Sequence, residues 1–304
     1  MTWKTKAVIQ RILSSFPGGV QVNYALQRYV TRTLPESETI FTDRVQIAQR
    51  HIEKLLAHGG GRLEDKLFFE FGAGRDLCGP LVFYSMGVTR QRLVDLQFLL
   101  RPFLVNDTLR RLRRDAARFH LPLSPAHFVR EDKEGCLEDL RHHYGIDFVA
   151  PSDARCTGLA DGAVDIITST NTLEHIPPTD IASILKELRR ILAPDGRLSF
   201  LVDYQDHWSY FDSNINVYNF LCYSAAEWAP YNPDLNYQNR LRHADYMRLY
   251  QQADFGIVDE HTEGAQPTDL EKIAAIPVVA SEFAHFDPVA LSLRKGFVVL
   301  KAKT

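Results

Sequence analysis

Short apolar runs that alternate with helical patterns constrain the fold of this chain more than any other feature. The expected strands are residues 67–71, 92–95, 148–150, 164–168, 197–202, 256–260 and 296–301. Amphipathic helices lie between the central strands. The clearest of them carries Ile181 and Leu188 on one face and is closed by the Pro-Asp-Gly sequence at 194–196. Strands that alternate with helices predict βαβ units, and therefore an α/β fold with a doubly wound, mostly parallel sheet of seven strands.

The first 62 residues differ in character from the rest of the chain. Phe41, Val45 and Ile52 recur at helical spacing, and charged residues occupy the other side of the same segment. Glycines at positions 59–61 then end this helix. We therefore expect an N-terminal helical cap over residues 1–62 and a larger domain over residues 63–304.

Composition and charge limit the classes of protein to which this chain can belong. The 304-residue chain has a formal net charge of -3 and a pI near 6.4, which disfavours nucleic acid as a partner. Its four cysteines form no C-x-x-C pair, so we expect reduced thiols and neither a zinc site nor disulfides. No apolar run is long enough for a spanning helix, and residues 2–16 lack a secretory signal pattern. These features predict a cytoplasmic protein without stable membrane insertion.

Residues 2–16 form a basic amphipathic segment. Such a helix can lie on a membrane surface, so peripheral contact stays open. The simpler interpretation is a helix that packs on its own protein.

The first expected strand ends at glycines. The apolar run is followed by Glu70 and then by Gly72-Ala73-Gly74. Glycines at a strand-to-helix turn leave bare backbone amides, which a nucleotide-like ligand can approach closely. Because the same pattern occurs in turns that bind nothing, the other strand ends decide its meaning.

Polar residues follow three further strands. Asp95 ends the second strand, Asp153 follows the third, and the fourth leads into a loop with Asn171 and His175. In a doubly wound sheet the ligand crevice lies at the carboxyl ends of the strands. A carboxylate there can accept hydrogen bonds from both hydroxyls of a ribose. The strand ends together predict a single ligand site.

The order of these motifs resembles that of the class I S-adenosylmethionine-dependent methyltransferases. The similarity rests on Glu-x-Gly-x-Gly at 70–74, the acid at 95, Asp-Ala at 153–154, Leu-Glu-His-Ile-Pro at 173–177 and Leu-x-x-Ile-Leu-x-Pro-Asp-Gly at 188–196. It covers about residues 67–202 and is similar to the small-molecule branch with the Leu-Glu-His loop. The resemblance implies a Rossmann-like fold, S-adenosylmethionine as the cofactor and S-adenosylhomocysteine as its product.

The resemblance also implies roles for individual residues. The glycine loop would pass under the methionine part of the cofactor, and Glu70 would orient that loop. Asp95 would hold the ribose, and Asp153 would bind the adenine amino group. Together with Asp76, which departs from the family pattern, the predicted cofactor-binding residues are Glu70, Gly72, Ala73, Gly74, Asp95, Leu96, Asp153, Ala154 and Asn171.

Asp76 and Leu77 depart from related patterns. The methyltransferase family commonly has a third glycine where this chain has Asp76, and the dinucleotide motif G-x-G-x-x-G needs glycine where it has Leu77. Leu77 therefore counts against NAD or FAD and against a Rossmann-type oxidoreductase. The Asp76 carboxylate suits the cationic methionine ammonium, or it is simply the N-cap of the next helix.

His207, His175 and Asp203 are the candidate catalytic residues. A hydroxyl or amine acceptor benefits from a general base, and histidine has a suitable pKa. His175 follows the fourth strand, but in similar proteins this histidine often holds the loop. His207 follows the fifth strand beside Asp206, and it either acts as a base or anchors the next segment.

An aromatic-rich insert of about residues 204–250 follows the fifth strand. Aromatic faces with amide and guanidinium donors suit a sugar or a planar acceptor, or the rings form the core of a small subdomain. Because Arg240 and Arg242 alternate, at least one should face solvent or an anionic ligand group. The candidate substrate residues are Tyr204, Trp208, Tyr210, Tyr237, Arg240 and Arg242.

A less specific similarity, at residues 203–210 and 237–243, is to methyltransferases encoded with polysaccharide-assembly enzymes. It implies a small-molecule acceptor, a hydroxyl of a sugar or glycan precursor. An aromatic or polyketide-like acceptor, and a cofactor-binding protein without turnover, are the alternatives. We expect no metal site, since His142-His143 fits a solvated pair better than a ligand set.

Overall fold

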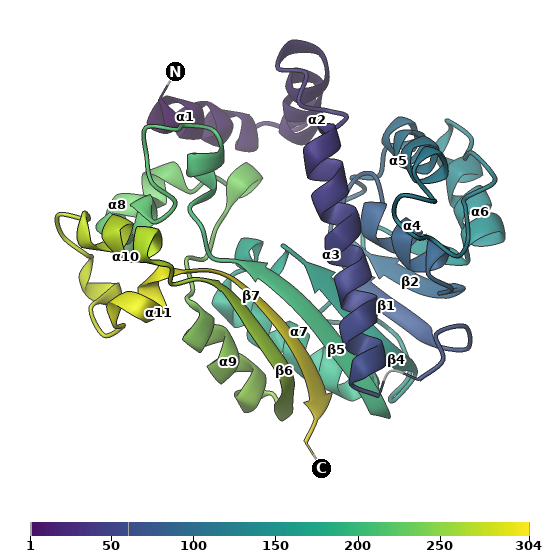
Figure 1. Ribbon diagram of the computed structural model, residues 1–304. Coiled ribbons are helices and arrows are strands. Elements are labelled where there is room, and N and C mark those ends of the chain that lie inside the picture. The colour runs from purple at the N-terminus through teal and green to yellow at the C-terminus, as the bar shows by residue number, and fades with distance from the viewer. Residues whose placement is uncertain (1, 60, 304) are drawn as a thin grey trace.

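The computed structural model describes residues 2–59 and 61–303, which contain a seven-stranded sheet in the order β3-β2-β1-β4-β5-β7-β6 (Figure 1). The strands are β1 (Leu67–Phe71), β2 (Arg90–Val94), β3 (Ile146–Val149), β4 (Val164–Thr170), β5 (Leu192–Asp203), β6 (Phe255–Gly264) and β7 (Leu293–Ala302). The pairs among β1 to β5 are parallel, whereas β7 runs antiparallel to both β5 and β6. The predicted doubly wound, mostly parallel sheet is confirmed.

Helices cover both faces of this sheet (Figure 1). On one face, α3 (Glu38–Ala57), α4 (Cys78–Ser85), α5 (Pro102–Arg114) and α6 (Lys133–Tyr144) share a core with Phe68 and Leu93. On the other face, α7 (Pro178–Ile191) and α9 (His243–Gln252) pack with Phe69, Leu198 and Phe200. The core side chains alternate along each strand, so one strand supplies both layers.

One predicted boundary is wrong. The Pro-Asp-Gly sequence at 194–196 does not separate a helix from a strand, because β5 already begins at Leu192. The register shows why: Val164 pairs with Leu192, but Ile166 pairs with Arg197. The intervening residues bulge out of the ladder, and such a bulge accommodates proline and glycine inside a strand.

The N-terminal segment divides between two cores. The buried face of α3 belongs to the sheet core. The two preceding helices are α1 (Trp3–Ser14) and α2 (Gly19–Ala25), which continues into a short π-helix, η1 (Leu26–Val30). Trp3 of α1 instead packs on Trp208 and Trp228, with ring centroids 6.2 and 5.8 Å apart. The division of the chain at residue 62 stays a prediction.

The segment after β5 forms a small subdomain of short helices. Its rings pack on one another: Trp208, Phe220 and Trp228 are buried in a cluster that Trp3 completes. Burial of these rings supports the interpretation that they form a core. The short elements there and elsewhere are η2 (Leu173–His175), η3 (His207–Tyr210), η4 (Asn219–Cys222), α8 (Ala225–Trp228), η5 (Ala229–Tyr231), η6 (Asp234–Asn236), α10 (Pro267–Ala274), η7 (Ser281–Phe283) and α11 (Pro288–Ser292).

Within residues 2–59 and 61–303, no helix combines the length and the apolar character needed to cross a bilayer.

Candidate active site

A cavity of about 430 Å³ opens at the carboxyl ends of β1, β2 and β4. This is the edge of a doubly wound sheet at which ligands bind. Val20 and Asn23 of α2, and Asp234 and Leu235 of the subdomain, close it from outside the sheet. The implied cofactor residues in its wall are Gly72, Gly74, Asp95, Leu96, Asp153, Ala154 and Asn171. Glu70, Ala73 and Asp76 do not line the cavity.

The two glycines of the loop have different reasons to be glycine. Both take a left-handed conformation, with φ of +74° at Gly72 and +77° at Gly74. A Cβ on Gly72 would come within 2.3 Å of Cγ2 of Thr172, so here the loop after β4 approaches closely. A Cβ on Gly74 would meet no described atom within 4 Å. The backbone at Gly74 therefore faces open space, which a cofactor that passes over the backbone requires.

The two strand-end acids differ in what holds them. Asp95 accepts a hydrogen bond from the Gln97 amide at 3.2 Å, and burial raises its pKa. Asp153 forms an ion pair with Arg155 at 2.7 Å, which lowers its pKa. Arg155 also reaches Asp180 at 2.8 Å. Asp95 is thus the freer acceptor in the cavity, while Asp153 shares its carboxylate with a cation.

Glu70 is a buried acid beneath the glycine loop. The Thr168 hydroxyl donates to its carboxylate at 2.7 Å. Burial, partly offset by that hydrogen bond, raises the pKa of Glu70 to about 7. The folded protein therefore holds this proton more tightly than the unfolded chain does.

The free energy of unfolding should depend on pH through Glu70. The contribution of its raised pKa is fully present below about pH 4.5 and is lost as the pH rises through about 7, amounting to about 3 kcal/mol. Glu70→Gln is neutral at every pH, so its unfolding free energy should lack this part of the decrease. Urea unfolding at pH 5 and pH 8 measures the difference. The exposed Glu53→Gln is the control, and an equal pH dependence in wild type and Glu70→Gln would contradict the assignment.

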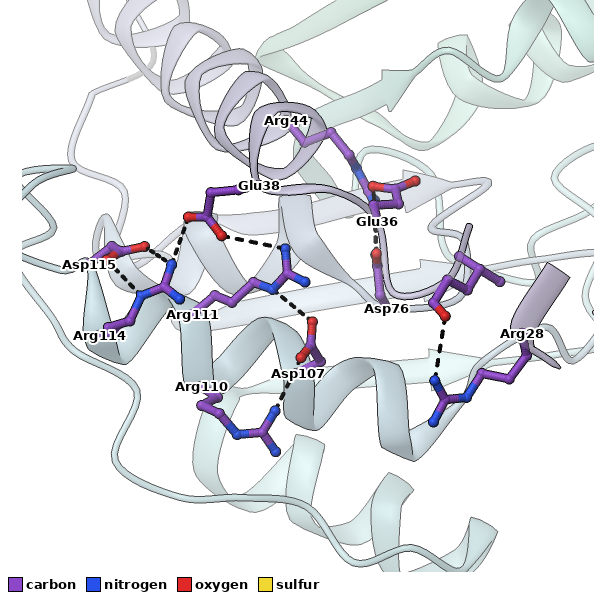
Figure 2. A network of polar contacts seen from close by, with 11 residues as sticks. Arg28, Glu36, Glu38, Arg44, Asp76, Asp107, Arg110, Arg111, Arg114 and Asp115 are labelled. Atoms are coloured by element: carbon purple, nitrogen blue, oxygen red, sulfur yellow. Dashed lines mark hydrogen bonds and ion pairs between the residues drawn. The ribbon is translucent and has the colours of Figure 1, made fainter. Parts of the chain in front are cut away.

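Asp76 is already engaged by an arginine. Figure 2 shows its carboxylate facing Arg44 of α3, with contacts of 2.6 and 2.8 Å, and Arg44 also reaches Glu36 at 2.8 Å. The alternative prediction, that Asp76 is the N-cap of the next helix, is wrong. The N-cap of α4 is Leu77, whose φ is +53°. Towards α4, Asp76 accepts a local hydrogen bond from the Cys78 amide, at 3.1 Å. Its charge is thus compensated by the N-terminal helix.

The same network extends along α3 and α5. Glu38 meets Arg114 at 2.6 Å and Arg111 at 3.8 Å, and Arg111 pairs with Asp107 at 2.8 Å (Figure 2). Most of these groups are partly exposed, so each pair contributes little alone. Together they fix the N-terminal end of α3 beside the glycine loop.

A second group of polar residues adjoins the cavity on the subdomain side. His175, in the cavity wall, lies next to His207, and their ring centroids are 4.9 Å apart. Nε2 of His207 is 3.7 Å from the Asp203 carboxylate. Burial lowers the pKa of His207 to about 4 and also lowers that of His175. Both rings are therefore neutral at neutral pH.

The structure brings together all three candidate catalytic residues. Asp203 accepts hydrogen bonds from Gln205 at 3.1 Å and from the Tyr210 hydroxyl. Asp206, in contrast, caps η3 by accepting from the Trp208 amide at 2.8 Å. The carboxylate that faces His207 is thus Asp203, four residues earlier in the chain.

Most candidate substrate residues are used inside the protein. Tyr204 and Trp208 are buried, with hydrogen bonds to His243 at 2.9 Å and to the Tyr231 carbonyl at 3.1 Å. The backbone carbonyl of Tyr237 accepts from His175 at 2.7 Å. Tyr210 is 61% exposed and stands beside His207. Tyr210 is therefore the best placed of the candidate rings to meet a ligand.

The prediction that at least one of Arg240 and Arg242 faces solvent is wrong. Arg240 is 9% exposed and donates to the Tyr223 carbonyl at 2.6 Å. Arg242 is fully buried and donates to the carbonyls of Tyr204 and Leu291 at 2.6 and 2.7 Å. Both guanidinium groups satisfy backbone carbonyls, since irregular backbone between short helices leaves such acceptors unpaired.

Sequence reasoning missed Arg155, Arg44 and Glu174. Arg155 directly follows Asp153-Ala154, and a cation beside an implied binding acid was a usable signal. Arg44 lies 32 residues before Asp76, and nothing local connects the two. Glu174 was visible in the Leu-Glu-His loop, but only its burial reveals that it differs from a surface acid.

Comparison with known proteins bears on the family of this chain. A family model described as a methyltransferase domain matches residues 129–200. The chain is similar to a geranyl diphosphate C-methyltransferase from Streptomyces coelicolor, at 15% identity over 88% of this chain and 85% of that one, with a TM-score of 0.48. It is also similar to an S-adenosylmethionine-dependent methyltransferase from Leishmania major, at 13% identity over 98% and 83% of the two chains and a TM-score of 0.48. The search of curated proteins found no match.

The matched segment covers α6, β3, β4, α7 and most of β5. It therefore includes the loops that carry Asp153, Asn171 and His175. The remaining implied cofactor residues lie at the ends of β1 and β2 or just after them, at the same edge of the sheet. The match identifies residues 129–200 as part of a methyltransferase domain, and the strand order is that of a Rossmann-like methyltransferase fold.

Proposed function

We propose that this enzyme methylates a hydroxyl group of a small polar acceptor, most simply a sugar or glycan precursor. The observation that carries the proposal is the position of His175, which belongs both to the cavity wall and to the polar group with His207 and Asp203. The cofactor cavity thus continues into a set of groups that suit a hydroxyl.

Different residues of the cavity wall would hold different parts of the cofactor. Gly72 and Gly74 offer bare backbone under the methionine part, and Asp95 offers acceptor oxygens to the ribose. Asp153 would bind the adenine amino group while it keeps Arg155 as a partner. S-Adenosylmethionine, when bound, supplies an activated methyl group.

On the side where the methyl acceptor would bind, the protein offers atoms that can accept a hydrogen bond from its hydroxyl group. Nε2 of His207 is buried, and none of the described residues hydrogen-bonds to it. A neutral imidazole with a free lone pair can accept the proton of a hydroxyl, and such positioning of a base typically contributes 10²–10⁴-fold to rate. Asp203 lies 3.7 Å from the same nitrogen, and its carboxylate would stabilise the imidazolium that forms when Nε2 takes up the proton.

Four of the polar side chains in a largely apolar wall favour a sugar hydroxyl. Asn23, Arg155, Asp180 and Asp234 all line the cavity. Carboxylates and amides pair well with the many hydroxyl donors of a sugar. The alternative, an aromatic or polyketide-like acceptor, is favoured by exposed Tyr210 beside His207.

A transfer assay tests the proposal. The protein is incubated with methyl-labelled S-adenosylmethionine and two acceptor panels, one of sugars and glycan precursors and one of phenolic compounds. We expect labelled methyl ethers of the first panel. Turnover of the phenolic panel alone would establish the alternative. Tight cofactor binding with no product from any acceptor would instead indicate a binding protein without turnover.

Substitution of His207 tests its role in the same assay. His207→Gln should leave the Kd of S-adenosylhomocysteine unchanged and lower kcat by about 10²-fold or more. His261→Gln, an exposed histidine of β6, is the matched control. Unchanged turnover in His207→Gln would remove His207 from the mechanism.

A further inference from the structure

We propose that Glu174, His175 and His207 form a binding site for a divalent transition-metal cation. Each residue offers one ligand atom, and these atoms all lie within 4.8 Å of one another. Ligands around a single ion with bonds of about 2.0–2.2 Å lie roughly 3–4 Å apart, so a small closure of side chains completes the site. The expectation that the sequence contains no metal site did not consider Glu174.

Glu174 is the observation that most needs an explanation. Its side chain is 1% exposed, and no described residue forms a hydrogen bond to either carboxylate oxygen. A buried carboxylate without a partner is costly, and buried charges are normally paired or coordinate a metal. A bound cation would supply a positive charge and bind the carboxylate and the free imidazole nitrogens; with the cation bound, His207 is a ligand, and the cation takes over from the ring the activation of an acceptor hydroxyl.

His175 is already oriented as a metal ligand. Its Nδ1 lies 2.7 Å from the Tyr237 carbonyl oxygen, which can only accept, so Nδ1 carries the hydrogen. The lone pair of the neutral ring therefore resides on Nε2. Histidines that bind metals commonly donate their other N–H to a carbonyl or carboxylate, which fixes the tautomer and the ring direction.

His207 and Asp203 complete the surroundings. Nε2 of His207 is a second buried atom without a partner among the described residues. The Asp203 carboxylate, 3.7 Å from that nitrogen, is itself held by Gln205 and Tyr210. Glu174 and His175 follow β4, and His207 follows β5, two strands that pair directly up to Thr170 and Leu201. The sheet therefore brings both halves of the site together on rigid elements.

The donor set defines the class of cation. Two imidazole nitrogens and one carboxylate oxygen suit Mn²⁺, Fe²⁺, Co²⁺ or Zn²⁺ better than Mg²⁺ or Ca²⁺, which prefer oxygen ligands. Three protein ligands leave coordination positions for an external oxygen. Because His175 also lines the cavity, such an oxygen could belong to the acceptor hydroxyl. This last role rests on the proposed function, whereas the cation site itself does not.

Metal titration of the full chain tests the site directly. After chelator treatment and dialysis, Mn²⁺ and then Zn²⁺ are titrated by calorimetry, without cofactor or acceptor. We expect saturable binding of one ion per chain. Glu174→Gln keeps the shape of the side chain but removes the charged ligand, so we expect an affinity loss of at least about 10–100-fold. His207→Gln should give a similar loss and provides a second result should Glu174→Gln fail to fold.

Surface histidines require a control. A second histidine cluster that could bind Zn²⁺ surrounds His143. The centroid of its ring lies 4.0 Å from that of His127 and 4.8 Å from that of His142. His143→Gln should leave the titration of the proposed site unchanged. Absence of saturable binding, binding that survives both Glu174→Gln and His207→Gln, or binding that is lost in His143→Gln would each overturn the proposal.

A chelation experiment separates the site from the proposed function. Methyl transfer should fall after chelation and recover on addition of Mn²⁺. Saturable binding that depends on Glu174, together with no transfer to any acceptor, would count against the proposed function and support the cation site. Transfer that persists at full rate in the chelated protein would overturn the role of the cation in holding the acceptor.

Discussion

Asp95→Ala should weaken the binding of S-adenosylmethionine by about 10–100-fold. Asp95 lines the cavity at the end of β2, and its carboxylate is held by backbone amides such as that of Gln97 rather than by a cation. Hydrogen bonds to a charged group contribute about 1.5–3 kcal/mol each, and about 1.4 kcal/mol corresponds to a tenfold change in Kd. Alanine would remove the hydrogen bonds predicted between Asp95 and the ribose without filling the space.

Calorimetric titration with S-adenosylhomocysteine measures this effect. Asp147→Ala is the matched control, because Asp147 sits on neighbouring β3 and pairs with Arg141 at 2.8 Å, away from the cavity wall. It should bind the cofactor product as the wild type does. Equal affinities of Asp95→Ala and wild type would show that the ribose does not lie at β2.

Arg242→Ala should lower the free energy of unfolding by about 3–5 kcal/mol. The guanidinium is fully buried and donates to the carbonyls of Tyr204, Leu291 and Leu293. These carbonyls come from the end of β5, from α11 and from the start of β7. Alanine leaves all three acceptors buried without a donor and also opens a cavity.

Chemical denaturation compares this variant with Arg248→Ala. Arg248 lies on the same helix, α9, but its side chain is 60% exposed, and among the described residues it forms an ion pair with Asp245 alone. We expect Arg248→Ala to change stability by less than about 0.5 kcal/mol. A similarly small effect of Arg242→Ala would mean that water replaces the guanidinium. Selective loss of acceptor binding with unchanged stability would restore the substrate role expected from the sequence.

The strands were predictable because burial leaves a local signature. Leu67–Phe71 occurs where the sequence predicts it, and the other strands deviate at their ends by a few residues. Strand-end residues were equally accessible, since parallel strands bring their carboxyl ends to one edge. Gly72, Gly74, Asp95 and Asp153 accordingly share one cavity.

The failures share a different cause. The position of Asp76 depends on Arg44, and the burial of Arg240 depends on carbonyls about 17–20 residues earlier. Neither relation produces a periodicity or a motif. Side chains that serve irregular backbone therefore resemble ligand-binding side chains when only the sequence is read.

The sequence by itself determined the sheet and the edge at which the implied cofactor residues gather, because these follow from short-range patterns of burial and turn chemistry. Tertiary structure alone decided which polar groups are free. It paired Asp76 with Arg44 and enclosed Arg242, yet left Glu174 and His207 buried beside His175 with no hydrogen-bond partner among the described residues for the Glu174 carboxylate or for Nε2 of His207. The physical reason is that the availability of a charge depends on its desolvation and its neighbours, and both are set by residues distant in the chain.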